Sequence, residues 1–262
     1  MDYTLNIKGQ LMSLAEPQVM GILNVTPDSF YSGSRMQTEQ AIAERSHQIV
    51  SEGGAIIDVG ACSTRPNSTP VDEAEEMARL RRALDIIRRE QPYAKLSVDT
   101  FRPNVARMAV EEFGADIIND VGEGEPEMLR MVSRLHVPYI LMSAQPTLYD
   151  TLLLFAKRVQ QLRDMGHQDI ILDPGFGFGK TLQQNYALMN ELEKLQVMEL
   201  PLLVGISRKS MIFRLLGNDP TEALNGSTVL HTIALLKGAS ILRVHDVKEA
   251  VECVKIVEGL RG

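Results

Sequence analysis

The stretch IILDPGFGFGK at residues 170–180 joins a short apolar run to a carboxylate, Asp173, which a loop with three glycines follows. A parallel strand that is buried on both faces must be apolar along its length, so a charged residue at its end is costly unless that residue reaches a polar cleft. An α/β barrel builds its active site from the C-terminal ends of its strands, so we expect similar strand ends to meet there. Further apolar runs end at or just before Asn24, Asp58, Asp99, Asn119, Lys209 and Arg243.

The apolar runs predict eight strands, and a helical pattern follows each of them. The strands are expected at 19–24, 55–60, 95–99, 115–121, 137–142, 169–173, 201–206 and 239–244. Helices are recognised by an apolar face between charged positions. They are expected at Thr38–Ser51, Val71–Glu90, Pro103–Phe113, Pro126–Leu135, Leu152–Met165, Gln183–Leu195, Ala223–Lys237 and Val247–Leu260.

This order of elements favours the α/β class and, within it, a (β/α)8 TIM barrel. A β-hairpin is expected ahead of the first strand, from Tyr3 to Leu14. No low-complexity linker interrupts the chain, so residues 1–262 are expected to form a single domain. At this length folding can bury roughly three quarters of the surface of the unfolded chain. An open, doubly wound sheet is the alternative architecture.

Composition limits the partners and the location of the protein. The formal net charge of −7 argues against a general nucleic-acid or membrane-surface binder, because such proteins need a positive field over one face. The N-terminus lacks the basic start of a signal peptide, and no apolar run approaches the ~20 residues that span a bilayer. Only Cys62 and Cys253 are present, so a disulfide framework is not expected. A cytoplasmic protein is therefore expected.

The glycine-rich segment imitates two nucleotide-binding motifs and matches neither. A P-loop would need glycine where the chain has Pro174, and the dinucleotide fingerprint G-x-G-x-x-G is here G-x-G-x-G. The segment does place a carboxylate at a strand end, beside glycines that allow the backbone to approach a flat ligand closely.

Two basic segments follow the last two expected strands, at the positions where barrels often hold phosphate. Ser207-Arg208-Lys209-Ser210 follows the seventh strand, and Arg243 and His245 fall on the same side of the extended eighth segment. These cations could face one anion, or they could form ordinary surface salt bridges.

The acidic strand ends are Asp58, Asp99, Asn119 and Asp173. Converging carboxylates can bind a divalent metal, serve as acid and base, or accept hydrogen bonds from an N–H-rich heterocycle. Some of them could also merely cap the following helix. The amide oxygen of Asn24 suits a Mg²⁺ ion bridged to phosphate, although Asn24 could equally form a turn.

Together these residues resemble the dihydropteroate synthase family over nearly the whole chain after Val19. The resemblance is carried by GILNVTPDSF at 21–30, STRP at 63–66, SVDTFRP at 97–103, IIND at 117–120, LDPGFGFGK at 172–180, GISRKS at 205–210 and LRVHDV at 242–247. It implies a transferase of folate biosynthesis that condenses 6-hydroxymethyl-7,8-dihydropterin pyrophosphate with p-aminobenzoate, giving 7,8-dihydropteroate and pyrophosphate. It also implies a homodimer and a sulfonamide target.

The resemblance also implies roles for individual residues. The pterin would be bound by Asp99, Asn119, Asp173, Met142, Lys209 and Arg243, and p-aminobenzoate would lie against Phe30, Thr64, Pro66 and Ser210. Asn24 would help to hold Mg²⁺, and Arg65, Arg243 and His245 would bind the pyrophosphate. The catalytic residues would be Lys209, Arg243, His245, Arg65 and Asp99, whose main task is to stabilise the charge of the leaving group.

The chain departs from the family pattern in three loops. Cys62 replaces a glutamate and Asn67 a glycine around Thr64-Arg65-Pro66, and Tyr31-Ser32-Gly33-Ser34 after Phe30 lacks a carboxylate. After Met142, the segment Ser143-Ala144-Gln145-Pro146-Thr147 replaces one that contains histidine and glycine. These changes leave a non-catalytic pterin-binding paralogue as an alternative. A pterin-dependent methyltransferase ranks lower, because it has little need for the anion-binding groups.

Overall fold

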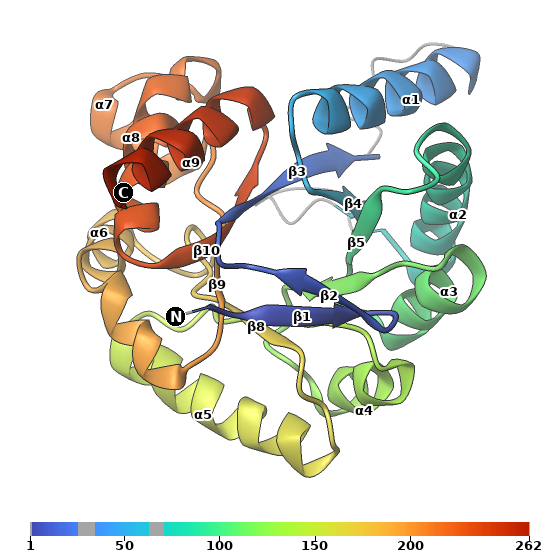
Figure 1. Cartoon of the computed structure of the whole chain (residues 1–262), viewed down its shortest axis with the longest axis horizontal. Helices are drawn as coiled ribbons and strands as arrows, with labels where there is room; N and C mark the ends of the chain where they lie inside the picture. The colour runs from blue at the N-terminus through green and yellow to red at the C-terminus, as the bar shows by residue number, and fades with distance from the viewer. Residues whose placement is uncertain (1, 26–34, 63–70, 262) are drawn as a thin grey trace.

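The computed structural model describes residues 2–25, 35–62 and 71–261, with only the backbone described at 35–38 and 261. Eight parallel strands form a closed barrel in the order β10-β3-β4-β5-β6-β7-β8-β9 (Figure 1). This confirms the (β/α)8 prediction and excludes the open sheet. The strands are β3 (Gln18–Asn24), β4 (Ile56–Gly60), β5 (Lys95–Asp99), β6 (Ile117–Asp120), β7 (Tyr139–Met142), β8 (Ile170–Asp173), β9 (Leu202–Val204) and β10 (Ala239–Val244).

Helices surround the barrel, as the apolar periodicity predicts. They are α1 (Arg35–Ser51), α2 (Glu73–Glu90), α3 (Pro103–Phe113), α4 (Pro126–Leu135), α5 (Leu148–Asp164), α6 (Leu182–Asn190), α7 (Ser210–Leu216), α8 (Leu224–Leu236) and α9 (Val247–Arg261), with the 3₁₀ helices η2 (Leu192–Met198) and η3 (Pro220–Glu222). No helix in the described part of the chain has both the length and the apolar character needed to cross a membrane.

Two details of the helical prediction were wrong. The expected single helix at Gln183–Leu195 is divided, because Glu191, between α6 and η2, leaves the helical conformation with φ −110° and ψ 12°. Leucine spacing continues across this break, which is why the pattern does not reveal it. Helix α7 was not expected, since its seven residues are too few to show a helical period before Gly217 ends it at φ 71°.

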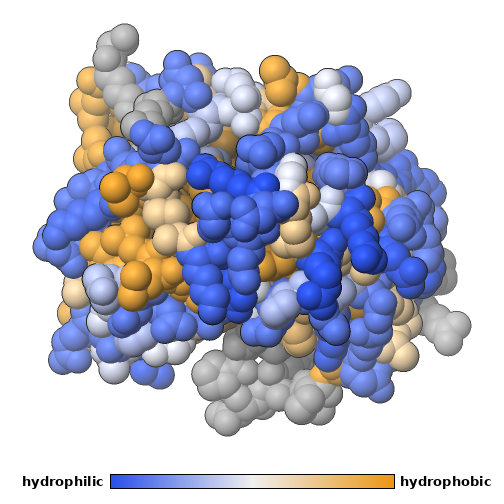
Figure 2. Space-filling view, turned by 90° about the horizontal axis from the view of Figure 1, so that it is seen from below, coloured by the Kyte–Doolittle hydropathy of each residue, from blue (hydrophilic) through white to orange (hydrophobic). Residues whose placement is uncertain are grey.

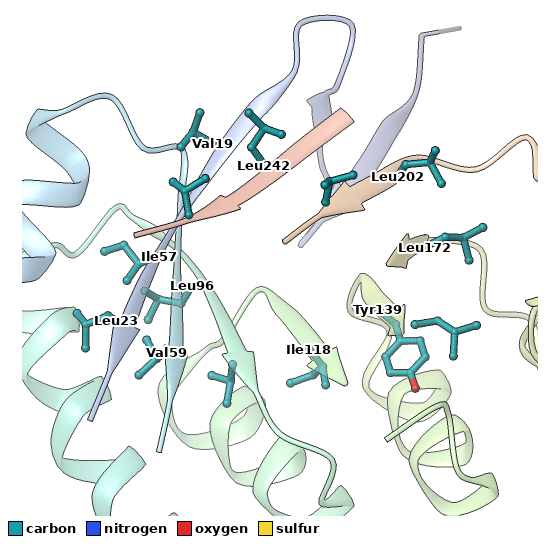
Figure 3. Packing of buried hydrophobic residues seen from close by; sticks show 14 of the residues in the cluster. Val19, Leu23, Ile57, Val59, Leu96, Ile118, Tyr139, Leu172, Leu202 and Leu242 are labelled. Carbon is teal, nitrogen blue, oxygen red and sulfur yellow. The ribbon is translucent and has the colours of Figure 1, made fainter. Parts of the chain in front are cut away.

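Successive residues of each strand face two different cores. One set packs outward against the helices, and Figure 3 shows ten of its members labelled, among them Leu23, Val59 and Tyr139. The alternate residues form a second cluster inside the barrel. Because side chains alternate along a strand, the residue two positions after each inner apolar residue also faces inward, nearer the C-terminal end. The inner apolar residues are Met20, Ile56, Ile117, Ile140, Ile171, Leu203 and Ile241.

The N-terminal hairpin closes the opposite end of the barrel. Strands β1 (Thr4–Ile7) and β2 (Gln10–Ser13) pair antiparallel, which confirms the expected hairpin. Leu5 and Ile7 are buried in the inner cluster together with the first inward residues of the strands. Lys8 reaches Asp116 across 2.6 Å, so the hairpin is also tied down electrostatically. The polar strand ends are thereby left to the open C-terminal end.

Candidate active site

Arg243, on β10, is paired with carboxylates on β4 and β5, which lie second and third after β10 in the order of the barrel. Its Nε donates to Asp58 Oδ2 at 2.6 Å, and its Nη2 donates to Asp99 Oδ2 at 2.8 Å. Arg243 is the next-to-last residue of β10, Asp58 the middle residue of β4 and Asp99 the last residue of β5. They lie two positions after Ile241, Ile56 and Ser97, as the inward alternation requires. Asp58 is fully buried, so the pairs are not ordinary surface salt bridges.

Asp58 also holds Asn119, the inward residue of β6. The Nδ2 of Asn119 donates to Asp58 Oδ2 at 3.2 Å, which fixes the orientation of the amide. Asn119 Oδ1 and Asp58 Oδ1 are buried and have no hydrogen-bond partner among the described residues. A buried acceptor without a donor is costly, so both oxygens suit the N–H groups of a ligand.

Burial and charge set the protonation of this cluster. Burial raises the pKa of Asp99 to about 7, against the attraction of Arg243 and with a further contribution from Asp58. Burial opposes the charge of Arg243 as well, but Asp58 and Asp99 outweigh it and raise the pKa of the guanidinium above its ordinary value. Asp99 therefore changes its charge close to neutral pH while Arg243 stays charged.

Asp173 ends β8 on the other side of the barrel mouth. Its Oδ1 accepts a hydrogen bond of 2.8 Å from the Gly175 N–H, which fixes the carboxylate at the start of the glycine-rich loop. Burial raises the pKa of Asp173, and the charge of Lys209 opposes that shift. The carboxylate and the ammonium are thus close enough to interact electrostatically.

Lys209 lies between the glycine-rich loop and Arg243. Its Nζ donates to the Phe176 carbonyl and lies 4.5 Å from the centre of the Phe178 ring. An ideal Cβ built on Gly205 would lie 3.8 Å from Arg243 Cβ and 4.0 Å from Lys209 Nζ, so both cations border the same glycine. Burial lowers the pKa of Lys209 to about 8, and Asp173 opposes that shift.

The two neighbours of Lys209 in the sequence have structural contacts. Arg208 has a left-handed backbone, with φ 52°, and its guanidinium donates to both carboxylate oxygens of Asp246 at 2.8 and 2.9 Å. It also donates to the carbonyls of Pro220 and Thr221. This arrangement turns the chain so that Lys209 points into the barrel mouth. Arg208 itself therefore forms a salt bridge near the surface, one of the two possibilities that the sequence left open for these basic residues.

His245 follows β10 and is tied to Ser207, in the segment between β9 and α7. Its backbone N–H donates to Ser207 Oγ at 3.1 Å, its Nδ1 lies 3.2 Å from the same oxygen, and its carbonyl accepts from Arg45. Burial, followed by the charge of Arg243, lowers the pKa of His245 to about 4. The imidazole is therefore neutral at pH 7 in the free protein, and it offers one N–H rather than a positive charge.

The remaining expected site residues lie at the same end or outside the described chain. Met142 ends β7 and is buried, and Ser210 begins α7. Asn24 ends β3, where its Oδ1 lies 3.3 Å from the position of an ideal Cβ on Gly60. Phe30, Thr64, Arg65 and Pro66 lie outside the described residues.

Two residues of the site were not given their roles by the sequence. The sequence places Asp58 among the acidic strand ends, but only the hydrogen bonds across the closed barrel show that it holds Arg243 and Asn119. Lys180 ends the glycine-rich stretch and donates to three backbone carbonyls, of Ser143, Gly175 and Phe178. The signal that could have identified Lys180 is its place directly after a segment with three glycines, whose carbonyls no side chain of their own shields from an ammonium.

Comparison with protein families gives one match over most of the chain. Residues 20–245 match the family model described as "Pterin binding enzyme". The curated dihydropteroate synthase of Escherichia coli (strain K12) is 39% identical over 96% of this chain and 94% of its own length. That of Bacillus subtilis (strain 168) is 36% identical over 92% of this chain and 88% of its own length.

Solved structures give the same answer. The Xanthomonas albilineans dihydropteroate synthase with 4-aminobenzoic acid is 36% identical, with a TM-score of 0.92 over 100% of this chain and 99% of that one. A Yersinia pestis dihydropteroate synthase in a sulfonamide drug complex is 39% identical, with a TM-score of 0.88 over 99% of both chains. The similarity therefore covers the barrel, the hairpin and the barrel mouth together.

Proposed function

The chain belongs to the dihydropteroate synthase family of pterin-binding enzymes, and we propose the following division of labour in its active site. The substrates are 6-hydroxymethyl-7,8-dihydropterin pyrophosphate and p-aminobenzoate, and the products are 7,8-dihydropteroate and pyrophosphate. One observation carries the proposal. Arg243 is held between Asp58 and Asp99, and both the unpaired Oδ1 of Asn119 and the ammonium of Lys209 lie near these three residues.

The acceptors bind the pterin ring. Carboxylates accept from ring N–H and amino groups, and the geometry offers Asp99, Asp173 and the unpaired Oδ1 of Asn119. Lys209 donates to the carbonyl or ring-nitrogen edge, since an ammonium has three N–H donors and Phe176 takes only one. Met142, inward at the end of β7, covers one face of the ring.

The cations bind the departing pyrophosphate. Arg243 has five N–H donors, of which Asp58 and Asp99 take two, so its guanidinium can lie on the ring and still reach phosphate. His245 adds an N–H donor, and Arg65 is proposed to add a further charge. Electrostatic stabilisation of the leaving group is then the main catalytic effect.

The arylamine needs no strong base. The bond between the methylene carbon and the pyrophosphate oxygen breaks first and leaves a pterin methylene cation. The neutral amino group of p-aminobenzoate then forms the C–N bond and gives up one proton to the solvent. Phe30, Thr64, Pro66 and Ser210 are proposed to border p-aminobenzoate. Of these, Ser210 is described, and it begins α7 directly after Lys209.

A magnesium ion fits this site as a partner of the substrate. No group of three His, Cys, Asp or Glu side chains that could hold a metal occurs in the described ranges, so an all-protein cage is not offered there. Mg²⁺ typically takes one or two protein oxygens and completes its shell with phosphates and water. Asn24 would hold it. The Oδ1 of Asn24 and the Oδ2 of Asp99 both border Gly60, since they lie 3.3 Å and 3.7 Å from the position of an ideal Cβ there, so the two oxygens face the same space. When bound, the ion neutralises charge on the pyrophosphate.

We also propose that residues 1–262 form one domain that works in the cytoplasm as a homodimer. Both cysteines are free thiols, which suits a reducing compartment. Large apolar side chains are exposed on α8 and α9, including Leu236 at 59% and Ile256 at 64%. Figure 2 shows the molecule from below, the face along which α4 and α5 lie in Figure 1, and hydrophobic residues gather on the left of that face as well. Light scattering should give twice the chain mass, and Leu236→Arg together with Ile256→Arg should reduce it.

Pyrophosphate release, measured with and without p-aminobenzoate, tests the proposed reaction. The purified chain with Mg²⁺ should form dihydropteroate only when both substrates are present, and p-aminobenzoate should increase the release of pyrophosphate. Lys209→Ala should abolish the release, and unchanged turnover in that variant would refute the site assignment. Calorimetry separates the alternative, since binding of the pterin pyrophosphate without product would favour a non-catalytic paralogue.

A further inference from the structure

Two loops at the barrel mouth are packed against each other without space for side chains. The segment Ser143–Gln145 follows β7, and residues 174–179 follow β8. An ideal Cβ on Gly175 would lie 2.1 Å from the Ser143 carbonyl oxygen and 2.6 Å from Met142 Sδ. One on Gly179 would lie 3.0 Å from the Ala144 carbonyl oxygen. The positions of the two loops are therefore coupled, and a shift in one must move the other.

The ammonium of Lys180 lies at this contact. It donates to the carbonyls of Ser143 at 2.9 Å, of Gly175 at 3.1 Å and of Phe178 at 3.4 Å. All three of its hydrogens thus have backbone acceptors, one in the first loop and two in the second. Charge-assisted bonds are about twice as strong as neutral ones, so one side chain fixes both loops.

Glu123, in the loop after β6, holds the first loop from its other side. Its Oε1 accepts from the Ala144 N–H at 2.7 Å and from Gln145 Nε2 at 3.1 Å. The Glu123 backbone is left-handed, with φ 59°, and its carbonyl accepts from Arg158. Ser143–Gln145 is therefore held between a carboxylate and an ammonium that come from two different strand ends.

The residues that these loops carry face the ligand side of the mouth. Met142 directly precedes the first loop, and Asp173 directly precedes the second. Phe178 lies over the ammonium of Lys209, whose Nζ also donates to Phe176. The carbonyls of Gly175 and Phe178 thus face Lys180, and the carbonyl of Phe176 faces Lys209. Two lysines share the carbonyls of one loop.

We propose that Lys180 is a positioning residue for the pterin pocket. It clamps loop 174–179 to Ser143 and so keeps Met142, Phe178 and Lys209 in the arrangement that receives the ring. The identity of the ligand in this statement rests on the proposed function. The clamp itself rests only on the described contacts.

The test compares Lys180→Met with Lys157→Met, a matched change at an exposed lysine on α5. Methionine keeps the length of the side chain and removes the ammonium. Hydrogen–deuterium exchange should become faster in peptides covering 143–147 and 174–180 and should stay unchanged in α2 and α3. The KM for the pterin pyrophosphate should rise between about tenfold and 100-fold, the range that misplaced binding groups can cost.

A merely structural role would lower the melting temperature and the fraction of active enzyme, and so kcat, without raising KM. Lys180→Arg keeps the charge, so its KM for the pterin pyrophosphate should lie between that of the wild type and that of Lys180→Met. Unchanged exchange in both loops of Lys180→Met would overturn the clamp, and faster exchange with an unchanged KM would overturn its role in binding. If the wild-type chain released no pyrophosphate, the proposed function would fail, while the exchange comparison would still decide on the clamp.

Discussion

Arg243 Nε lies 2.6 Å from Asp58 Oδ2, and Asp58 is fully buried at the point where β4 passes under the barrel mouth. The same oxygen, Asp58 Oδ2, also accepts a hydrogen bond from Asn119 Nδ2. It therefore orients one donor, Arg243, and one acceptor, Asn119, and would act on the proposed pterin through these two residues. Breaking a buried ion pair by removing one partner typically costs about 3–5 kcal/mol.

Asp58→Asn should consequently reduce both stability and catalysis. We expect a loss of about 3 kcal/mol in the free energy of unfolding, since the partly buried Arg243 keeps only Asp99 as a carboxylate partner. Urea unfolding measures the loss. Asp85→Asn on the exposed side of α2 is the matched control, and equal stability of the two variants would contradict the role given to Asp58.

Gly175→Ala should disturb the pterin pocket much more than Gly166→Ala. Both glycines have a positive φ, of 66° and 79°, so both substitutions introduce backbone strain of about 1–3 kcal/mol. A methyl group at Gly166 meets nothing within 4 Å, whereas one at Gly175 collides with Ser143 and Met142. Thermal unfolding should therefore shift in both variants, but pterin binding in calorimetry should weaken only in Gly175→Ala. Equal binding in the two variants would refute the packing argument.

The rate should depend on pH on both sides of neutrality. Below about pH 7 Asp99 takes up a proton and weakens its pair with Arg243, and above about pH 8 Lys209 loses its charge. The value of kcat/KM for the pterin substrate should therefore be bell-shaped, with limbs near these two pH values. Asp99→Asn should remove the acidic limb. A variant with an unchanged acidic limb would show that another group titrates there.

Acid should destabilise the fold through His231, which is buried on α8. Burial lowers its pKa to about 4 from an ordinary 6.5, so the unfolded chain takes up the proton first as the pH falls. The contribution of this histidine to stability is therefore present above pH 6.5 and lost as the pH falls toward 4. In urea unfolding, the midpoint of the wild type should fall more between pH 6.5 and pH 4.5 than that of His231→Gln. Parallel curves would show that His231 does not titrate in this way.

Much of the fold follows from local patterns. The strands at 95–99 and 239–244 and the helices at Pro103–Phe113 and Pro126–Leu135 have the predicted bounds, because each lies between clear breaks in periodicity. The inward direction of Asp58, Asp99, Asn119, Asp173 and Arg243 follows from alternation along buried strands. Local pattern thus suffices for the barrel and for the general placement of its polar end.

Other features depend on contacts between distant segments and leave no local pattern. The pairing of Arg243 with Asp58 spans 185 positions and exists only because β10 lies next to β3 in the closed barrel. The neutral state of His245 at pH 7 depends mainly on burial, which its own motif does not show, and then on the charge of Arg243 two positions earlier. The contact of Lys180 with the Ser143 carbonyl likewise joins residues 37 positions apart, so the sequence around Lys180 does not reveal it. The roles of Phe30, Thr64, Arg65 and Pro66 stay predictions.

The carboxylates at the barrel mouth are proposed to bind the pterin ring itself, apart from its diphosphate. Calorimetry with 6-hydroxymethyl-7,8-dihydropterin, which lacks the diphosphate, measures this directly for the wild type and for Asp173→Asn. We expect the variant to bind at least about tenfold more weakly, because a hydrogen bond to a charged group contributes about 1.5–3 kcal/mol. An unchanged dissociation constant in a folded Asp173→Asn protein would contradict the assignment of the acceptors to the ring.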